Sequence, residues 1–179
     1  DLPRPALAGA TQFGNAATAI AALDASTLAV SREAVAQGLG QVRLQGRFQI
    51  VPGEVEWILD VAHNAPAAAE LGRELAARPI PGRTLAVAGF LDDKDVASIG
   101  LVLRGQVDEW VLTTLPPPRG LDAGSVVARL RLEAAPLATC ASVAEACARA
   151  RALARPGDRI VVFGSFHVVG PALEWLRLY

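Results

Sequence analysis

Apolar residues along the chain gather in short continuous runs that alternate with longer amphipathic stretches. The runs at 85–89, 110–114 and 160–164 are almost wholly apolar and contain no alternating polar face. Runs of this length and character predict strands that are buried on both faces of a sheet. Taken along the whole chain, the pattern predicts strands at 47–51, 55–62, 84–90, 109–115, 136–140 and 159–166.

Between these strands, apolar residues recur at helical spacing. The pattern predicts helices at 65–78, 95–105, 125–132 and 141–154, followed by a closing helix that runs to Leu178. The first two strands flank a Pro-Gly-Glu turn at 52–54 and predict a hairpin. The remaining strands alternate with helices, which is typical of parallel crossover units. We therefore expect an α/β fold: a Rossmann-like, mostly parallel sheet with helices on both faces.

The first 40 residues lack such strands and predict two helices instead. The stretch 11–25 is rich in alanine, with Thr11 or Asn15 as a possible cap, and 31–40 follows with Ser31 as its expected N-cap. Gly38 or Gly40 is expected to end the second helix. We therefore expect two units: a short helical segment at 1–40 and the Rossmann-like domain at 41–179.

Composition and charge exclude several classes of protein. Of 179 residues, 52% are hydrophobic, which suits a packed core rather than a disordered chain. The net charge is −1, so no basic surface is expected for nucleic acid or for an anionic membrane. No apolar run approaches the roughly 20 residues that span a bilayer. The two cysteines, Cys140 and Cys147, cannot form a disulfide framework. We expect a cytoplasmic protein.

The sequence also lacks the common phosphate-binding motifs. Its only lysine, Lys94, follows Asp93 rather than a glycine, so the chain contains no Walker-type loop. A Gly-x-Gly-x-x-Gly fingerprint is missing too, which argues against a dinucleotide site. The chain holds no methionine and begins with Asp1. We expect it to be a piece of a longer protein.

In open α/β sheets, ligands bind beyond the carboxyl ends of the strands. Chemically capable residues follow four predicted strands: Asp60 and His63, Lys94, Arg119, and Ser165 with His167. Each also has a structural interpretation. Asp60 and Ser165 could cap the helices that follow them. His63 could be a histidine at the edge of the core. Asp92, Asp93 and Asp95 could form an acidic first helical turn, with Lys94 solvated beside them. Arg119 could be an ordinary surface residue, and the cysteines are expected to be buried and inert.

Five blocks in this order point to a known family. They are Leu44-Gln45-Gly46-Arg47-Phe48-Gln49, Ile58-Leu59-Asp60-Val61-Ala62-His63-Asn64, Asp93-Lys94-Asp95, Pro118-Arg119-Gly120 and Gly164-Ser165-Phe166-His167. The series resembles the C-terminal domain of the bifunctional dihydrofolate synthase/folylpolyglutamate synthases, relatives of the Mur ligases. The stretch Asn15-Ala16-Ala17-Thr18-Ala19 resembles the helix that ends the family's ATP-binding central domain.

This resemblance implies a reaction. ATP phosphorylates the carboxylate of a pteroate or folate, and the amine of L-glutamate then displaces phosphate in a cleft between two domains. It implies nucleotide contacts for Asn15, Arg47 and Asp60, and catalytic roles beside the reacting phosphate and glutamate for His63 and Ser165. Lys94, Arg119 and His167 are expected on the substrate side, and no residue of this chain is expected to bind metal.

The same resemblance implies cofactors and partners. ATP and Mg²⁺ are expected in the full-length enzyme, with neither bound by this chain alone, because the phosphate loop and magnesium ligands belong to the preceding domain. That missing domain, L-glutamate and dihydropteroate or folate are the expected partners of a monomer. Two alternatives remain open: a Mur-type ligase acting on peptidoglycan precursors, and a non-catalytic α/β binding module.

Overall fold

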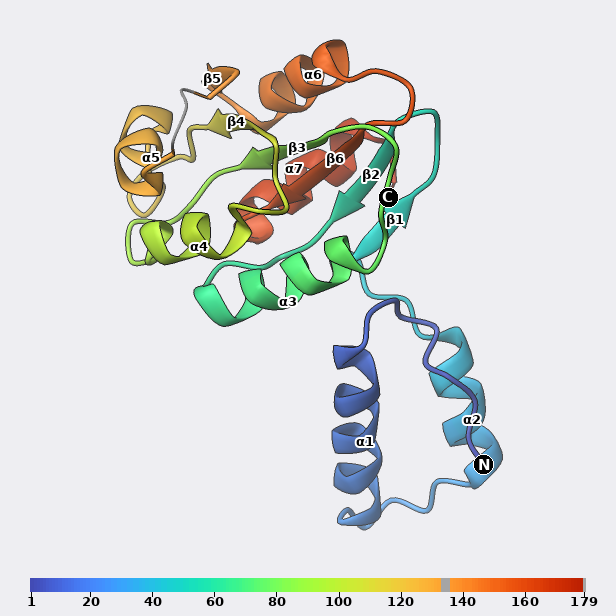
Figure 1. The fold of residues 1–179 in the computed structure, drawn as a ribbon. Coiled ribbons are helices and arrows are strands. Elements are labelled where there is room, and N and C mark those ends of the chain that lie inside the picture. Colours follow the sequence, from blue (N-terminus) through green and yellow to red (C-terminus); the bar gives the residue numbers. More distant parts are fainter. Residues whose placement is uncertain (133–135, 179) are drawn as a thin grey trace.

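The structure is a computed structural model that describes residues 1–132 and 136–178. Its centre is a six-stranded sheet in the order β1-β2-β6-β3-β4-β5. All neighbouring strands pair in parallel except β1 and β2, which form the predicted antiparallel hairpin. The expected fold class, an α/β fold with a mostly parallel sheet and a preceding helical segment, is confirmed (Figure 1).

The elements follow the predicted alternation. The strands are β1 (Gln49–Val51), β2 (Glu56–Leu59), β3 (Thr84–Ala88), β4 (Glu109–Thr113), β5 (Ala138–Cys140) and β6 (Arg159–Phe163). The helices are α1 (Thr11–Asp24), α2 (Arg32–Gln41), α3 (Ala65–Ala76), α4 (Val96–Leu103), α5 (Ala123–Leu130), α6 (Val143–Leu153) and α7 (Phe166–Trp175). No helix in the described ranges has both the length and the apolar character needed to cross a lipid bilayer.

Both faces of the sheet are buried, as the continuous apolar runs predict. One core lies between the sheet and α3, α4 and α5, and the other lies between the sheet and α6 and α7 (Figure 1). On the first face, the Phe163 ring makes edge contacts with Phe90 at 5.9 Å and with Trp110 at 6.0 Å between ring centroids. These contacts join β6, β4 and the segment after β3, so the sheet forms a rigid frame for the loops at its carboxyl edge.

An ionic network closes the amino edge of the sheet. Arg159 is 2% exposed, and its guanidinium donates to Glu56 at 3.1 Å and to the carbonyl oxygens of Leu75 and Arg78. Beside it, Arg83 forms an ion pair with Asp158 at 3.0 Å. Burial of a charge is costly unless it is paired and hydrogen-bonded, and here both conditions are met. The charges at this edge therefore fasten α3 to the strands and leave the opposite edge for chemistry.

Several predicted helix ends differ from the structure. Neither Thr11 nor Asn15 caps α1, because the N-cap position is Ala10 and it has no side-chain cap. The helix α2 runs through both Gly38 and Gly40 to Gln41, since neither glycine adopts a left-handed backbone. The expected Ser31 cap of α2 is present, with its hydroxyl accepting from the Ala34 amide.

The predicted ends of the C-terminal elements also shift. The last helix stops at Trp175 rather than Leu178, because Arg177 turns into the left-handed region (φ 56°). The strand predicted to extend to Phe166 ends at Phe163 instead. The chain breaks the strand at Gly164 (φ 121°), and Phe166 already belongs to α7.

The two N-terminal helices lie outside both cores. Neither α1 nor α2 contains a buried residue, although both carry apolar side chains. Figure 1 shows them projecting from the α/β body on the side of α3. A helix that buries nothing gains little from tertiary packing, so the helical segment and the α/β domain have different packing environments.

Candidate functional site

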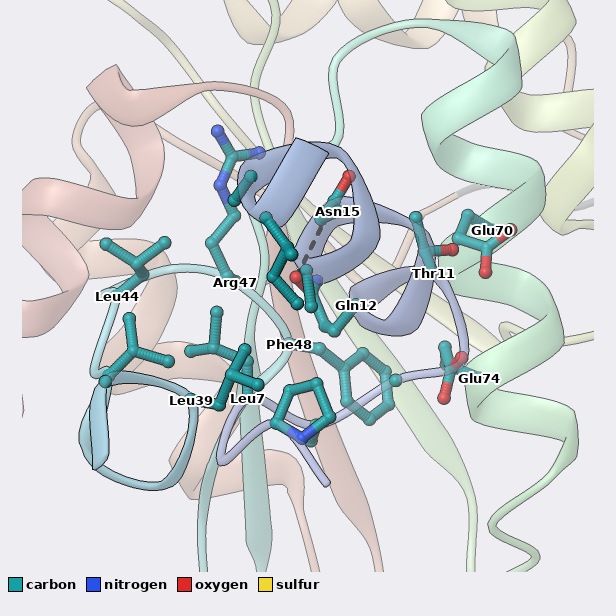
Figure 2. Close-up of a pocket in the computed structure, with 18 of the residues that line it drawn as sticks. Leu7, Thr11, Gln12, Asn15, Leu39, Leu44, Arg47, Phe48, Glu70 and Glu74 are labelled. Carbon is teal, nitrogen blue, oxygen red and sulfur yellow. Dashed lines mark hydrogen bonds between the residues drawn. The ribbon is translucent and has the colours of Figure 1, made fainter. Parts of the chain in front are cut away.

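A pocket of about 750 Å³ lies where the helical segment meets the α/β domain. Its walls come from α1, α2, the loop before β1, the carboxyl end of β2 and α3, with most of the α1 and α2 wall apolar (Figure 2). Asn15, Arg47 and Asp60 all belong to its lining. Three residues that are far apart in sequence therefore meet at one cavity, whose volume is in the usual range for small-molecule sites.

The loop that carries Arg47 has a strained, well-anchored backbone. Gly46 has φ 69° and Phe48 has φ 45°, so both neighbours of Arg47 adopt the left-handed conformation. A Cβ atom at Gly46 would lie 2.8 Å from Cγ1 of Val169 in α7, which is too close for any side chain. The Gly46 carbonyl oxygen accepts from the Val61 amide at 2.9 Å. Only glycine fits at 46, and this tight turn directs Arg47 outward.

Asp60 holds the same loop through its carboxylate. Its Oδ2 accepts from the Phe48 amide and its Oδ1 accepts from the Ala62 amide, each at 2.8 Å. Burial raises the pKa of Asp60 above its usual value, against the opposing effect of these two amides and of the nearby charges of Arg47 and His63. The interpretation of Asp60 as the cap of the following helix is wrong, because Asn64 caps α3 by accepting from the Ala67 amide.

Asn15 reaches the pocket from α1, the first helix. Its side-chain amide donates to Oε1 of Gln12 at 3.1 Å, and the dashed line in Figure 2 marks this bond. The position of α1 depends on two carboxylates of α3. Glu74 Oε1 accepts from the Ala10 amide at 2.5 Å, and a hydrogen bond from the Thr11 hydroxyl is the main cause that lowers the pKa of Glu70. Glu74 thus caps the start of α1, and Glu70 holds the Thr11 side chain beside it.

His63 is half-buried and lies just beyond the end of β2. Its Nδ1 lies 2.9 Å from the Val61 carbonyl oxygen. A carbonyl can only accept, so Nδ1 is the donor in this bond, and Nε2 has no hydrogen-bond partner among the described residues. His63 is near enough to Asp60 to influence its pKa, although it does not line the pocket.

Ser165 opens α7 next to a close contact between strands. A Cβ atom at Gly164 would lie 2.1 Å from the Gly89 carbonyl oxygen, so the carboxyl ends of β6 and β3 meet at a point that only glycine permits. Ser165 is 6% exposed, and its Oγ makes no hydrogen bond within the described part of the chain. The capping interpretation of Ser165 is wrong, since no side-chain cap bond forms. His167 is exposed in the first turn of the same helix.

Lys94 and Arg119 meet at a second cluster at this edge. The ammonium of Lys94 lies 2.7 Å from Asp93 Oδ2, and the Arg119 guanidinium lies 3.3 Å from Asp93 Oδ1. These hydrogen bonds, that of Lys94 first, lower the pKa of Asp93. The loop that carries Arg119 pairs with the segment after β3 through the Leu91–Gly120 bridge. The expected acidic helical turn is partly right: Asp95 caps α4, whereas Asp92 and Asp93 precede the helix.

The sequence-predicted residues thus fall into groups along one edge of the sheet. Asn15, Arg47 and Asp60 share the pocket, while His63, Ser165, His167, Lys94 and Arg119 lie outside its lining. Phe48, Glu70 and Glu74 line the pocket but were not predicted. The four-residue spacing of Glu70 and Glu74 places both on one helix face, which is the only indication the sequence offers. Across residues 1–132 and 136–178, no three His, Cys, Asp or Glu side chains group in a way that could hold a metal ion.

This arrangement can be compared with known proteins. Residues 46–166 match the family model described as Mur ligase, glutamate ligase domain. The chain belongs to this family. The matched range begins at the Gly46 turn and ends at the first residue of α7, so it contains every predicted site residue except Asn15 and His167.

The chain is also similar in sequence to individual proteins of this family. The chain is 43% identical over 160 residues to the dihydrofolate synthase/folylpolyglutamate synthase of Escherichia coli, covering 89% of this chain and 37% of that protein. It is also 32% identical over 179 residues, covering 92% of this chain, to the UDP-N-acetylmuramoyl-L-alanyl-D-glutamate–2,6-diaminopimelate ligase of Corynebacterium glutamicum, of which it covers 34%.

Solved structures show the same similarity at the level of the fold. The structure of E. coli FolC in complex with DHPP and ADP superposes with a TM-score of 0.86 at 40% identity, covering 99% of this chain and 41% of that one. A folylpolyglutamate synthase/dihydrofolate synthase of Yersinia pestis, complexed with AMPPNP and a Mn ion, gives a TM-score of 0.83 at 41% identity, covering 98% of this chain and 41% of that one. The chain therefore spans about two fifths of the length of these relatives.

Proposed function

We propose that this chain is the C-terminal part of an ATP-dependent ligase that joins L-glutamate to dihydropteroate and to folate. The observation that carries the proposal is the meeting of Asn15, Arg47 and Asp60 at one pocket, since these are the residues for which the family resemblance implies nucleotide contacts. The relatives named dihydrofolate synthase/folylpolyglutamate synthase support the choice of substrates. Residues 1–40 would then belong to the preceding ATP-binding domain, as their lack of buried side chains suggests.

The chemistry of the pocket residues suits a nucleotide. Arg47 offers a planar guanidinium that can donate two hydrogen bonds to one phosphate. Asp60 uses each carboxylate oxygen once for a backbone amide, which leaves acceptor capacity for the ribose hydroxyls. The Asn15 amide can both donate to and accept from an adenine edge. ATP supplies the phosphoryl group that turns the carboxylate of the pteroate or folate into an acyl phosphate.

The remaining residues would act on the second half of the reaction. Nε2 of His63 can accept a proton from the glutamate amine when it is unprotonated, and it can donate to a phosphate oxygen when it is protonated. The unpartnered, buried Ser165 Oγ can bind the same reactants as they enter. Lys94, Arg119 and His167 would bind the carboxylates of the substrates. Lys94 and Arg119 would then give up their ion pairs with Asp93 and form ion pairs with the substrate instead. Enclosure between two domains would protect the acyl phosphate from water.

We propose ATP and Mg²⁺ as requirements of the full-length enzyme, because relatives have been solved with ADP and with AMPPNP and Mn. We propose that this chain alone binds neither, and that the enzyme is a monomer located in the cytoplasm. The support for these finer points is the family resemblance, so each stays a prediction.

The test uses the full-length protein that carries this chain, incubated with ATP, L-glutamate and dihydropteroate. We expect ADP release that depends on both other substrates. Arg47→Ala should weaken ATP binding by about 1.5–3 kcal/mol, the value of hydrogen bonds to a charged group, and Asp60→Ala should weaken it less. Arg43→Ala is the matched control, because Arg43 is an exposed arginine on the same stretch that does not line the pocket.

Two outcomes would contradict the proposal. Unchanged ATP affinity in both pocket variants, with the fold intact, would remove the nucleotide site from this pocket. Ligation of a UDP-linked muramyl peptide in place of dihydropteroate would favour the peptidoglycan alternative, with which the C. glutamicum relative is consistent.

A further inference from the structure

Phe166 is exposed in a way that packing does not explain. It is the first residue of α7, and 64% of its surface is accessible although Val168 and Val169 of the same helix are fully buried. Among the described residues, its ring has one charged neighbour: the Arg47 guanidinium carbon lies 5.9 Å from the ring centroid. This separation is within the range of a cation–π interaction.

The backbone of Arg47 is held by hydrogen bonds, but its side chain has few contacts besides the Phe166 ring. The backbone on either side of it is fixed by the Gly46 carbonyl, which accepts from Val61, and by the Phe48 amide, which donates to Asp60. The side chain is not fixed in the same way. Within the described residues, the guanidinium has no ion pair and no hydrogen-bond acceptor, and only the ring of Phe166 and the more distant charge of Asp60 act on it.

We propose that Phe166 is a positioning residue that holds the Arg47 guanidinium in place for the nucleotide phosphates. The inference rests on the proposed function, in which Arg47 binds those phosphates. A long arginine side chain has many rotamers, and fixing it before the ligand arrives reduces the entropy lost on binding. An aromatic face restrains the guanidinium without occupying its N–H donors, which stay free for a phosphate.

The same contact links the two halves of the site. Phe166 follows Ser165 directly, so one helix start carries both the residue proposed for the reacting groups and the support for the nucleotide-side arginine. A loss of the ring should therefore weaken nucleotide binding while Ser165 stays in place.

The experiment measures kcat and KM for ATP in the full-length enzyme with Arg47→Ala, Phe166→Leu, Phe166→Tyr and the double variant Arg47→Ala/Phe166→Leu. We expect Phe166→Leu to raise KM for ATP about two- to fivefold, the range of an exposed cation–π contact, with kcat and Tm nearly unchanged. Phe166→Tyr keeps the aromatic face and should restore the KM. In the double variant, loss of the ring should add nothing to Arg47→Ala.

Phe13→Leu is the matched control. Phe13 is 52% exposed, and its ring centroid lies 6.0 Å from the guanidinium carbon of Arg4, but Phe13 does not line the pocket. The KM of the Phe13→Leu enzyme for ATP should therefore equal that of the parent.

Each other outcome overturns the inference. If Arg47→Ala raises KM but Phe166→Leu does not, or if the two effects simply add, Phe166 does not position Arg47, and the proposed function stands. Equal KM values for Phe166→Leu and Phe166→Tyr, or a KM rise that accompanies a large drop in Tm, would make the side chain a packing element. An Arg47→Ala variant with unchanged KM would refute this inference, and an unchanged KM in Asp60→Ala as well would refute the proposed function.

Discussion

The carboxylate of Asp60 shows how one residue can both build a site and face it. Its two oxygens restrain the Phe48 and Ala62 amides and so help the Gly46–Val61 hydrogen bond to hold the turn that presents Arg47. Burial opposes its ionisation, and Arg47 and His63 favour it. A nucleotide phosphate that engages Arg47 would weaken one of those two supports, which ties the charge of Asp60 to occupancy of the pocket.

His63 is the residue whose variant best separates catalysis from structure. Among residues 1–132 and 136–178, its side chain makes one hydrogen bond, from Nδ1 to a backbone carbonyl, so His63→Ala should cost about 1 kcal/mol of stability. If Nε2 takes part in proton transfer, the ligation rate of the full-length enzyme should fall by about 100-fold or more. Single-turnover ligation and thermal melting measure the two effects. A variant that melts early yet ligates at the normal rate would make His63 a structural residue.

Asp158 should make the chain sensitive to acid. It is buried, and although burial opposes its ionisation, the amides of Arg83 and Arg155 and the Arg83 guanidinium together lower its pKa. A carboxyl whose pKa is lowered on folding contributes stability above its unfolded pKa of about 3.9 and loses it as the pH falls through the folded pKa.

Asp158→Asn should therefore destabilise the chain by about 1–3 kcal/mol at neutral pH, because an amide cannot accept all of these bonds. The gap between the variant and the parent should close below about pH 4. Denaturant unfolding of both proteins at a series of pH values measures it. A gap that is independent of pH would show that shape, and not charge, matters at this position.

At the residue scale, the sequence could locate the site but not its detailed contacts. Asp60, Lys94 and Arg119 were found because parallel strands bring their carboxyl ends to one edge, and the structure places each of them there. The pairing of Arg47 with Phe166 and the roles of Glu70 and Glu74 could not be found. They arise between elements that are far apart in the chain, and no local pattern encodes which faces will meet.

At the scale of elements, the contact between the helical segment and the α/β domain depends on two carboxylates of α3 that accept hydrogen bonds from the start of α1. The first turn of α1 has no cap of its own, and Glu70 and Glu74 of α3 accept from Thr11 and from the Ala10 amide. Cap prediction failed at Thr11 and Asn15 for this reason, because the acceptors come from more than fifty residues away. By contrast, Ser31, Asn64, Asp95, Asp122 and Ser142 cap their own helices, where the preference is local.

Removing both borrowed carboxylates should loosen α1 without weakening the sheet. We expect the double variant Glu70→Ala/Glu74→Ala to show faster hydrogen exchange at the amides of residues 10–13, since the Ala10 amide loses its Glu74 acceptor and the Thr11 hydroxyl loses Glu70, which frees the first turn to open. The exchange of the β3 and β6 amides should not change. Glu174→Gln, on the exposed side of α7, is the control. Equal exchange at residues 10–13 in parent and double variant would show that α1 is held by other contacts.

At the scale of the whole molecule, the chain contains an α/β body with two buried cores and a helical segment with no buried residue, with the pocket at their boundary. The alternation of apolar runs was sufficient to predict the body, because each strand is buried on both faces. It was not sufficient to predict the pocket, since the placement of α1 and α2 depends on a few polar contacts rather than on a continuous core.

The proposed function predicts that this chain by itself does not turn over ATP. It has no Walker-type loop, and it spans only about two fifths of the relatives it matches. We expect the purified chain to release no ADP above background in the presence of L-glutamate and dihydropteroate, whereas the full-length protein does. Steady turnover by the isolated chain would show that the proposed division of labour between two domains is wrong.

The contacts of Glu70 and Glu74 with the start of α1 also have a consequence for the order in which the elements form. Glu70 and Glu74 can reach the start of α1 only after α3 has formed and docked on the sheet, because an unfolded α3 holds no fixed acceptors. We therefore expect the first helix in the sequence to be among the last elements fixed during folding. On the same grounds, we expect the Asn15 side of the pocket to form after the Arg47 and Asp60 side and to open first under stress.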